Sequence, residues 1–257
     1  TRPELKAVSL APAPVNFANL TAATPLGAFA TLGIDTACTP SGNVDRPEHT
    51  IPKATYAGTV IVAVIYLSVT AVMLFLIPYT QLAQSQAPFV DILKGFLGDN
   101  VGQWMGIFVV ISGLGALNGW TLLVGQMTRT MALNNTMPRG LSVLNSAGAP
   151  IKALVLSGVL GTLLAIMSYS ETLADGYLFL SMVVTAANLP IYILTAIALL
   201  RMPDKSAIAN YTLYACLALL AILFVVLTFF GIGILPLLWA LALSLLGLPV
   251  YWHVQNR

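Results

Sequence analysis

The stretch TPLGAFATLGIDTACTP, residues 24–40, contains two prolines, two glycines and four threonines within one apolar segment. Proline removes a backbone donor and glycine adds backbone freedom, so this composition weakens the hydrogen-bond ladder of a helix. The sequence therefore predicts a helix that is interrupted near Gly33. Asp35, the only acidic residue inside any of the long apolar segments, follows two positions later.

Asp35 is costly to place inside a membrane. A carboxylate at the centre of a membrane helix costs about 2.5 to 3.5 kcal/mol on insertion scales, so it persists where it faces a water-filled cavity or a partner. We therefore expect Asp35 to mark a pathway, where it attracts a cation or binds a proton. The alternative is a buried neutral Asp that is held by the hydroxyl of Thr36 or Thr39.

The composition is that of an integral membrane protein. Of 257 residues, 58% are hydrophobic and 8% are charged, against about 25% charged residues in soluble domains. A formal charge of +2, with no basic run, gives no sign of nucleic acid binding. Cys38 and Cys216 both lie in apolar segments, and no Cys/His spacing indicates a metal site, so we expect neither a disulfide nor a metal or other cofactor.

Seven segments have roughly the length and apolarity of a membrane span, which needs about 20 residues. They are 19–40, 55–77, 102–128, 153–167, 176–200, 208–230 and 234–254. Because lipid cannot satisfy open strand edges, the sequence predicts an all-α membrane protein with about seven transmembrane helices. We expect the third helix to continue through Leu133, and the last two spans, which have little interior polarity, to form a lipid-facing or oligomer surface.

The distribution of Lys and Arg predicts the orientation. One set of loops holds Arg46, Lys53, Arg129, Arg139, Lys152, Arg201, Lys205 and Arg257, and the opposite set holds Arg2, Lys6 and Lys94. The richer side is expected to be cytoplasmic, which places the amino terminus outside the cell membrane and the carboxyl terminus inside. Since the chain starts at Thr1 and its first span lacks the features of a signal peptide, its start is expected to be internal to a longer protein.

The third span carries polar and aromatic side chains far from its ends. Gly115 and Gly119 form a small-xxx-small face that permits close helix approach. Asn118, Trp120 and Gln126 are expected to have internal partners, because polar groups are costly in hydrocarbon, and Asn118 and Trp120 are predicted to line the pathway. For Trp120, simple packing is the alternative. Trp252 lies near a span end and is expected to anchor at the membrane interface.

Two further aromatic residues are candidates for the site. Phe29, before the predicted break, could cover a bound cation with its ring face. In the fifth span, Asn188, Pro190 and Tyr192 form a polar, kinked patch with Thr185. A proline in mid-span frees a carbonyl that Thr or Asn can satisfy, so support of the kink and a gating role are both open.

The sequence resembles a known family of transporters. The motif LGID at 32–35, followed by GNVDRPEHTIPKAT at 42–55, resembles the loop after the sixth span of amino acid-polyamine-organocation transporters. GALNGWTLLVGQ at 115–126, with Met137-Pro138 and GAP at 148–150, is similar to the eighth span and following loop of the basic amino acid/polyamine antiporter branch. The similarity covers most of the chain and fades in the last two spans.

The resemblance implies the second half of a leucine-transporter-type inverted repeat, in which five plus five spans are followed by two more. Residues 1–18 would be an external lead-in, 19–200 the second five-helix repeat, and 201–257 the two carboxyl-terminal helices. The expected partners are the lipid bilayer, an amino acid or polyamine, and the missing first repeat. A homologous transporter is the alternative to that repeat as a partner, and a homodimer is a further possibility.

The resemblance also assigns roles to residues. Phe29 falls where arginine/agmatine antiporters carry a Trp that stacks on the guanidinium, so cationic substrates are expected without that specificity. The carbonyls of Phe29 and Leu32, at the break near Gly33, would receive the substrate ammonium. Asp35 matches a Glu of proton sensing, and Trp120 matches the Trp on the inner side of the pocket.

Tyr192 has a less direct match within the family. The family's gating Tyr is replaced here by Ile191, and Tyr192 is adjacent, about 100° away on a helix.

The sequence therefore predicts exchange of cationic amino acids or polyamines by alternating access, with the chain inactive when alone. A non-transporting scaffold, or the complementing subunit of a split transporter, is the alternative. No second deep carboxylate, deep His or Ser/Lys pair accompanies Asp35, so we do not expect an enzyme.

Overall fold

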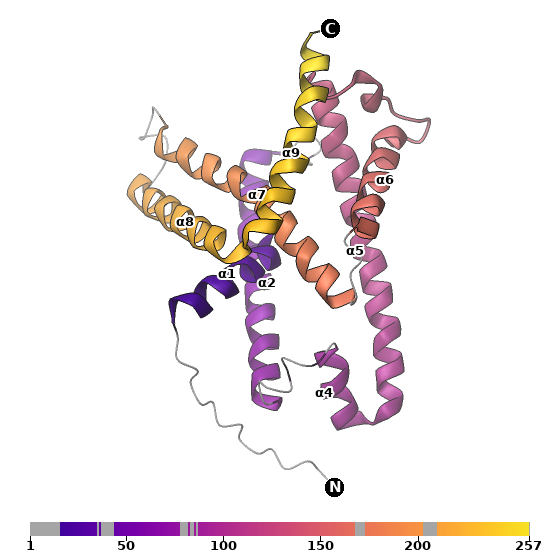
Figure 1. The fold of residues 1–257 in the computed structure, drawn as a ribbon, viewed down its shortest axis with the longest axis vertical. Coiled ribbons are helices and arrows are strands. Elements are labelled where there is room, and N and C mark those ends of the chain that lie inside the picture. The colour runs from indigo at the N-terminus through magenta and orange to yellow at the C-terminus, as the bar shows by residue number, and fades with distance from the viewer. Residues whose placement is uncertain are drawn as a thin grey trace. The chain divides into compact units, whose positions relative to one another are not determined.

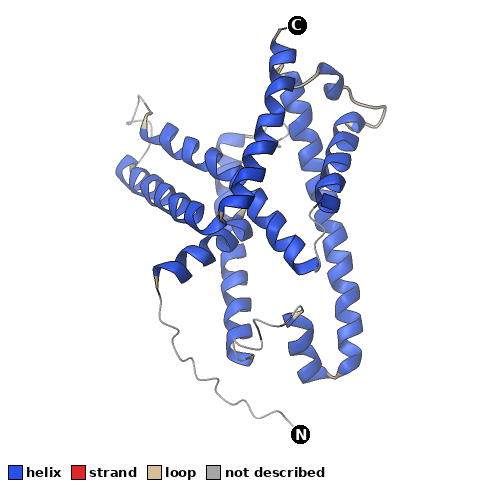
Figure 2. Cartoon of the chain, viewed as in Figure 1, coloured by secondary structure: helices blue, strands red, loops and turns tan. Residues whose placement is uncertain are grey.

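The computed structural model describes residues 16–34, 36, 44–77, 82, 85, 87–167, 173–202 and 210–256. Within these ranges the regular elements are helices, as Figure 2 shows. They are α1 (Phe17–Thr31), α2 (Pro47–Leu76), α4 (Pro88–Leu97), α5 (Asp99–Leu133), the 3-10 helix η2 (Arg139–Ser142), α6 (Ile151–Met167), α7 (Leu173–Leu200), α8 (Tyr211–Ile232) and α9 (Ile234–Gln255).

The helices confirm the all-α membrane prediction. Five of them, α2, α5, α7, α8 and α9, are long and apolar enough to cross a membrane, and α6 is a shorter apolar helix. Helix α1 has 15 residues, because it ends before the predicted span does. Helix α5 ends at Leu133, as predicted.

Helix α4 was not predicted, although its sequence carries a helical pattern. Pro88 occupies its first turn, and apolar residues recur at 89, 92, 93 and 96, with the spacing of one helical face. Ten residues are too few to cross the hydrocarbon core. The hydroxyl of Ser85 donates to the Asp91 carboxylate, which joins the preceding segment to the polar face of α4.

The chain forms two compact units. Unit 1 comprises Thr1–Pro12, Gly33–Thr130 and Ser142–Gly158, and unit 2 comprises Ala13–Leu32, Met131–Leu141 and Val159–Arg257. In unit 1, α2 contacts α4, yet α2 has no buried residue. Close approach of α5 to α6 occurs at Gly125, where an added Cβ would overlap the Leu154 side chain. A Cβ at Gly115 or Gly119 would meet nothing within 4 Å, so the predicted small-residue face is not packed.

Unit 2 has the better formed core. Helix α8 packs against α7 and α1, and α9 packs against α7, as can be followed in Figure 1. The core consists of Ala186, Leu189, Val225, Ile232 and Ala240. The last two spans were expected to form a lipid-facing or oligomer surface. That expectation does not account for the buried residues that α8 and α9 contribute to this core, Val225, Ile232 and Ala240.

The crossing of α1 and α8 depends on a proline and a glycine. Pro25 has no N–H, so the carbonyl of Thr21 lacks its usual donor in α1. The hydroxyl of Thr24 donates to that carbonyl instead, at 2.9 Å. On the α8 side, an added Cβ at Gly231 would overlap the Thr21 carbonyl oxygen and lie 3.0 Å from Pro25 Cδ. Glycine therefore allows α8 to approach the irregular turn of α1.

Candidate functional site

The helix of the first span stops at the predicted position. Helix α1 ends at Thr31, and Leu32 adopts an extended conformation, with φ −61° and ψ 141°. Gly33 follows with φ +100°, a conformation that residues with a Cβ rarely adopt. The boundary between the two compact units falls between these two residues. The expected departure from helical geometry near Gly33 is therefore present, while residues 35 and 37–40 of the predicted span lie outside the described residues.

Backbone carbonyls around the interruption are held by threonine hydroxyls and nearby amides. Thr31 Oγ1 donates to the carbonyl of Ala28 at 2.9 Å, and Thr36 Oγ1 donates to the carbonyl of Gly33 at 2.5 Å. The carbonyl of Phe29 accepts a bond from the amide of Leu32 at 3.2 Å. A carbonyl oxygen has two lone pairs, so this bond leaves room for a second donor such as an ammonium group.

Trp120 lies directly against the interruption, within unit 1. A Cβ at Gly33 would lie 2.7 Å from Cη2 and 2.8 Å from Cζ2 of the Trp120 ring. The Trp120 side chain is nevertheless 47% exposed, so part of the ring stays open beyond this contact. The structure thus brings together two of the residues that the sequence singled out, Gly33 and Trp120.

Asn118 lies on another face of α5. Residues two apart on a helix differ by about 200° in direction, so Asn118 points away from the Trp120 face. Its side chain is exposed, as is that of Gln126. Asn118 and Trp120 therefore do not approach one ligand from the same side of α5.

Phe29 is paired with a ring that the sequence analysis did not select. Phe29 and Tyr177, both in unit 2, meet edge to face, with ring centroids 5.9 Å apart and an interplanar angle of 88°. Edge-to-face pairs are a favoured aromatic geometry. Tyr177 is 61% exposed and stands in the first turns of α7. The sequence signal for Tyr177 is limited to an aromatic side chain near the start of a predicted span.

The polar patch of α7 is largely occupied with its own helix. Thr185 is fully buried and donates to the carbonyl of Ser181 at 2.7 Å, and the amide of Asn188 donates to the carbonyl of Val184 at 2.9 Å. Tyr192 is half-buried and packs against the core of unit 2. These contacts show a packing role for the patch, and gating by Tyr192 stays a prediction.

Asp35 lies outside the described residues. Within the described part of the chain, no group of three or more His, Cys, Asp or Glu side chains could hold a metal ion.

The chain is similar to several transporters of cationic compounds. It is 27% identical over 231 residues to the putrescine transporter PotE of Haemophilus influenzae, which covers 89% of this chain and 53% of that relative. It is 27% identical over 237 residues to a putative arginine/ornithine antiporter of Bacillus subtilis, covering 89% and 50%. A cadaverine/lysine antiporter of Escherichia coli is 31% identical over 139 residues, covering 54% and 31%.

These relatives bear on the extent and the class of the chain. The chain spans about half the length of the curated relatives named first. All three relatives are named as transporters or antiporters, which agrees with the expectation that the chain is not an enzyme. They also support the basic amino acid/polyamine antiporter branch. The model of the amino acid permease family matches residues 7–255. With its long apolar helices, the chain is a multi-pass membrane protein that belongs to the amino acid permease family.

Proposed function

We propose that this chain is the carboxyl-terminal half of an exchanger of cationic amino acids or polyamines, which works by alternating access. One observation carries the proposal: the first span is interrupted at Leu32 and Gly33, and Trp120 lies against the interruption. Broken helices in transporters present peptide groups and helix ends to a substrate near the middle of the membrane. The compounds after which the relatives are named, putrescine, arginine, ornithine, cadaverine and lysine, all carry amino groups.

In the proposed site, the interruption supplies oxygen acceptors and the rings supply π-faces. The carbonyls of Phe29 and Leu32 receive the substrate ammonium. The family resemblance assigns Phe29 to the face of the cation and Trp120 to the inner side of the pocket, although the two residues belong to different compact units. A cation over an aromatic face gains about 0.5 to 2 kcal/mol, depending on how fully water is excluded. Gly33 is required because it combines the positive φ with close contact to the Trp120 ring.

The remaining site residues have more peripheral roles in the proposal. Asp35 binds the proton that couples exchange to pH, and Tyr192 belongs to the gate. Asn118 lies on a different face of α5 from Trp120. In the proposal it contacts the substrate only if the pathway runs between this face of α5 and the helices of the first repeat.

A second set of helices is part of the proposal. Residues 19–200 form the second repeat and residues 201–257 the two added helices, while residues 1–18 lead in from outside and the carboxyl terminus is cytoplasmic. The lack of buried residues on α2 supports this arrangement, as do the exposed amides of Asn118 and Gln126 on α5. Since unsatisfied amides are costly in hydrocarbon, a protein partner rather than lipid is expected over this face of α5.

The test is exchange in proteoliposomes. The chain alone is reconstituted in one sample, and in another it is joined to the first half of the Bacillus subtilis relative. Uptake of labelled arginine, ornithine, lysine and putrescine is measured in each. We expect saturable exchange only in the joined protein. Robust uptake by the chain alone would contradict the need for a first repeat, and no uptake by either sample would contradict the transport function.

A non-transporting complementing subunit is the second candidate, favoured by the same uncovered surfaces of α2 and α5. It predicts stable co-purification with a full-length homologue without any exchange that depends on Trp120. Loss of exchange after Trp120→Ala, in a joined protein that still assembles, would exclude it.

A further inference from the structure

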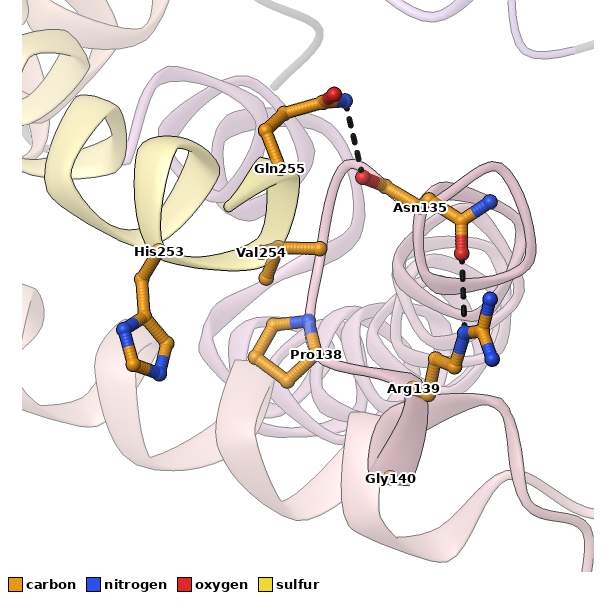
Figure 3. A pocket seen from close by; sticks show the side chains of 7 residues that line it. All are labelled: Asn135, Pro138, Arg139, Gly140, His253, Val254 and Gln255. Atoms are coloured by element: carbon orange, nitrogen blue, oxygen red, sulfur yellow. Dashed lines mark hydrogen bonds between the residues drawn. The ribbon is translucent and has the colours of Figure 1, made fainter. Parts of the chain in front are cut away.

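A pocket of about 570 Å³ lies in unit 2, remote in sequence from the interrupted span (Figure 3). It forms where the carboxyl-terminal end of α9 meets the turn that follows α5. The residues that line it are Asn135, Pro138, Arg139, Gly140, His253, Val254 and Gln255.

Asn135 holds the two walls of the pocket together. Its φ of +57° is in the left-handed region, which Asn tolerates better than most residues. This conformation ends α5, while the Asn135 carbonyl accepts a bond from Gln255 Nε2 at 3.4 Å. The Asn135 side-chain oxygen accepts a bond from Arg139 Nε at 3.1 Å. Figure 3 shows both bonds, and the second holds the guanidinium of Arg139 beside the Asn135 side chain.

The pocket has a basic lining. Arg139 and His253 contribute N–H donors, and none of the described residues that line the pocket is acidic. The surrounding sequence has the same bias, since no Asp or Glu occurs between Asp99 and Glu171 or after Asp204. Such a lining suits an anion. It would also suit neutralisation of the helix ends of α5 and α9, whose terminal carbonyls carry partial negative charge.

The position of the pocket on α9 points to a lipid. Tyr251 and Trp252 come directly before His253 and are 40% and 62% exposed, and such aromatic residues gather at the membrane interface. The preceding turns of α9 expose Leu245, Leu246 and Leu248, a surface suited to acyl chains. Basic pockets beside the ends of membrane helices are known sites for anionic headgroups.

From these observations we infer that the pocket binds the phosphate of an anionic phospholipid headgroup. Arg139 and His253 donate to the phosphate oxygens, and the acyl chains run along the exposed leucines of α9. The recognised chemistry is a phosphate, which a free anion could also supply, so the experiment separates the two sources. The inference does not depend on the proposed transport activity.

The experiment measures the thermal unfolding midpoint of the purified chain in detergent. Short-chain phosphatidylglycerol, short-chain phosphatidylcholine and inorganic phosphate are titrated in separate series. We expect a saturable rise in the midpoint with phosphatidylglycerol alone. The double variant Arg139→Gln/His253→Gln should weaken that affinity at least tenfold, because the guanidinium and imidazole donors to the phosphate are lost.

Two comparison variants keep the result interpretable. Arg201→Gln removes an exposed arginine at the end of α7, outside the pocket lining, and should leave the affinity unchanged. Arg139→Lys keeps the charge and should retain most of the phosphatidylglycerol affinity. If the double variant does not fold, the affinity of this single variant is still measurable.

Several outcomes would overturn the inference. Equal loss in Arg201→Gln, or an equal response to phosphatidylcholine, would mean that the pocket has no role in lipid binding. Equal affinity for inorganic phosphate would assign the site to a free anion. A double variant with a lower midpoint but an unchanged phosphatidylglycerol affinity would show that the basic residues only neutralise the helix ends.

Discussion

The indole ring of Trp120 lies where a side chain at Gly33 would begin, with Cη2 2.7 Å from the position of an added Cβ. Gly33 also has a φ of +100°, which a residue with a Cβ rarely adopts. Backbone conformation and close packing therefore select glycine independently at this position. The interruption of the first span and the aromatic residue of the third span form one structural feature.

Gly33→Ala should destabilise the chain, because the new methyl group meets the Trp120 ring and the backbone becomes strained. Overpacking costs about 1 to 3 kcal/mol, and the left-handed conformation adds about 1 kcal/mol or more. The readout is the midpoint of thermal unfolding in detergent. Adding Trp120→Phe should restore only the packing part of the loss.

Gly27→Ala is the matched control, since Gly27 is inside α1 and an added Cβ meets nothing within 4 Å. It should be neutral or stabilising, because alanine favours a helix by up to about 1 kcal/mol. Similar losses in both variants would show that Gly33 is not special.

Trp120→Ala should weaken binding of a cationic substrate more than Trp120→Phe does. Under the proposed function, the alanine variant loses a cation–π contact of about 0.5 to 2 kcal/mol, or roughly 2- to 30-fold in affinity. Equilibrium binding of labelled ornithine to the joined protein measures this loss. If both variants bind equally well, the role of Trp120 is confined to packing against Gly33.

Phe29 and Tyr177 should be energetically coupled. A double-mutant cycle with Phe29→Leu and Tyr177→Leu is expected to give a coupling of about 0.5 to 1.5 kcal/mol in the free energy of unfolding, the usual range for an edge-to-face pair. Tyr177→Phe should retain it. The control cycle pairs Phe29 with Tyr214, an exposed ring on α8, and zero coupling is expected there. A null result for the first cycle would contradict the ring geometry.

Gly231→Ala should loosen the packing of α8 against α1, because the added Cβ overlaps the carbonyl oxygen of Thr21. The overlapping atom belongs to the backbone of α1, so one of the two helices must shift to make room for the methyl group. A loss of about 1 to 3 kcal/mol in the free energy of unfolding is therefore expected. Gly247→Ala, in α9, adds a methyl group with nothing within 4 Å and serves as the control. An unfolding midpoint that is the same for both variants would argue against the close crossing.

Asp35→Asn should flatten the dependence of exchange on pH in the joined protein, because asparagine cannot bind a proton. The prediction comes from the sequence, where an isolated acid follows the interruption by two residues. Exchange is measured across a series of external pH values, with Asp45→Asn, an exposed acid before α2, as the control. A variant with the parental pH profile would remove Asp35 from the proton role.

Local composition was enough to predict much of the fold. The interruption at Gly33 was predictable because proline, glycine and threonine act on the nearest hydrogen bonds. The end of α5 at Leu133 was predictable from the loop composition that follows it. Helix α4 was not predicted although its apolar spacing is regular, because a helix of ten residues is too short to match the pattern of a 20-residue membrane span.

The site was only partly predictable for a different reason. Which ring meets Phe29 depends on how α1 and α7 pack, and no local pattern encodes the contact with Tyr177. The pairing of Gly33 with Trp120 likewise joins segments far apart in sequence, although both residues had been selected separately. Asn118 and Trp120 are both expected on the pathway because polar side chains deep in a span need internal partners, but helix geometry separates their directions.

The crossing of Gly231 over the Thr21 turn also has a consequence for biosynthesis. Translation delivers α8 about 200 residues after α1, which at about 5 to 20 residues per second is an interval of roughly 10 to 40 seconds. Throughout that interval the nascent α1 lacks its closest neighbour in unit 2. This unit can therefore mature only once α8 has been synthesised, and a product that stalls or terminates before α8 would be a ready substrate for membrane quality control.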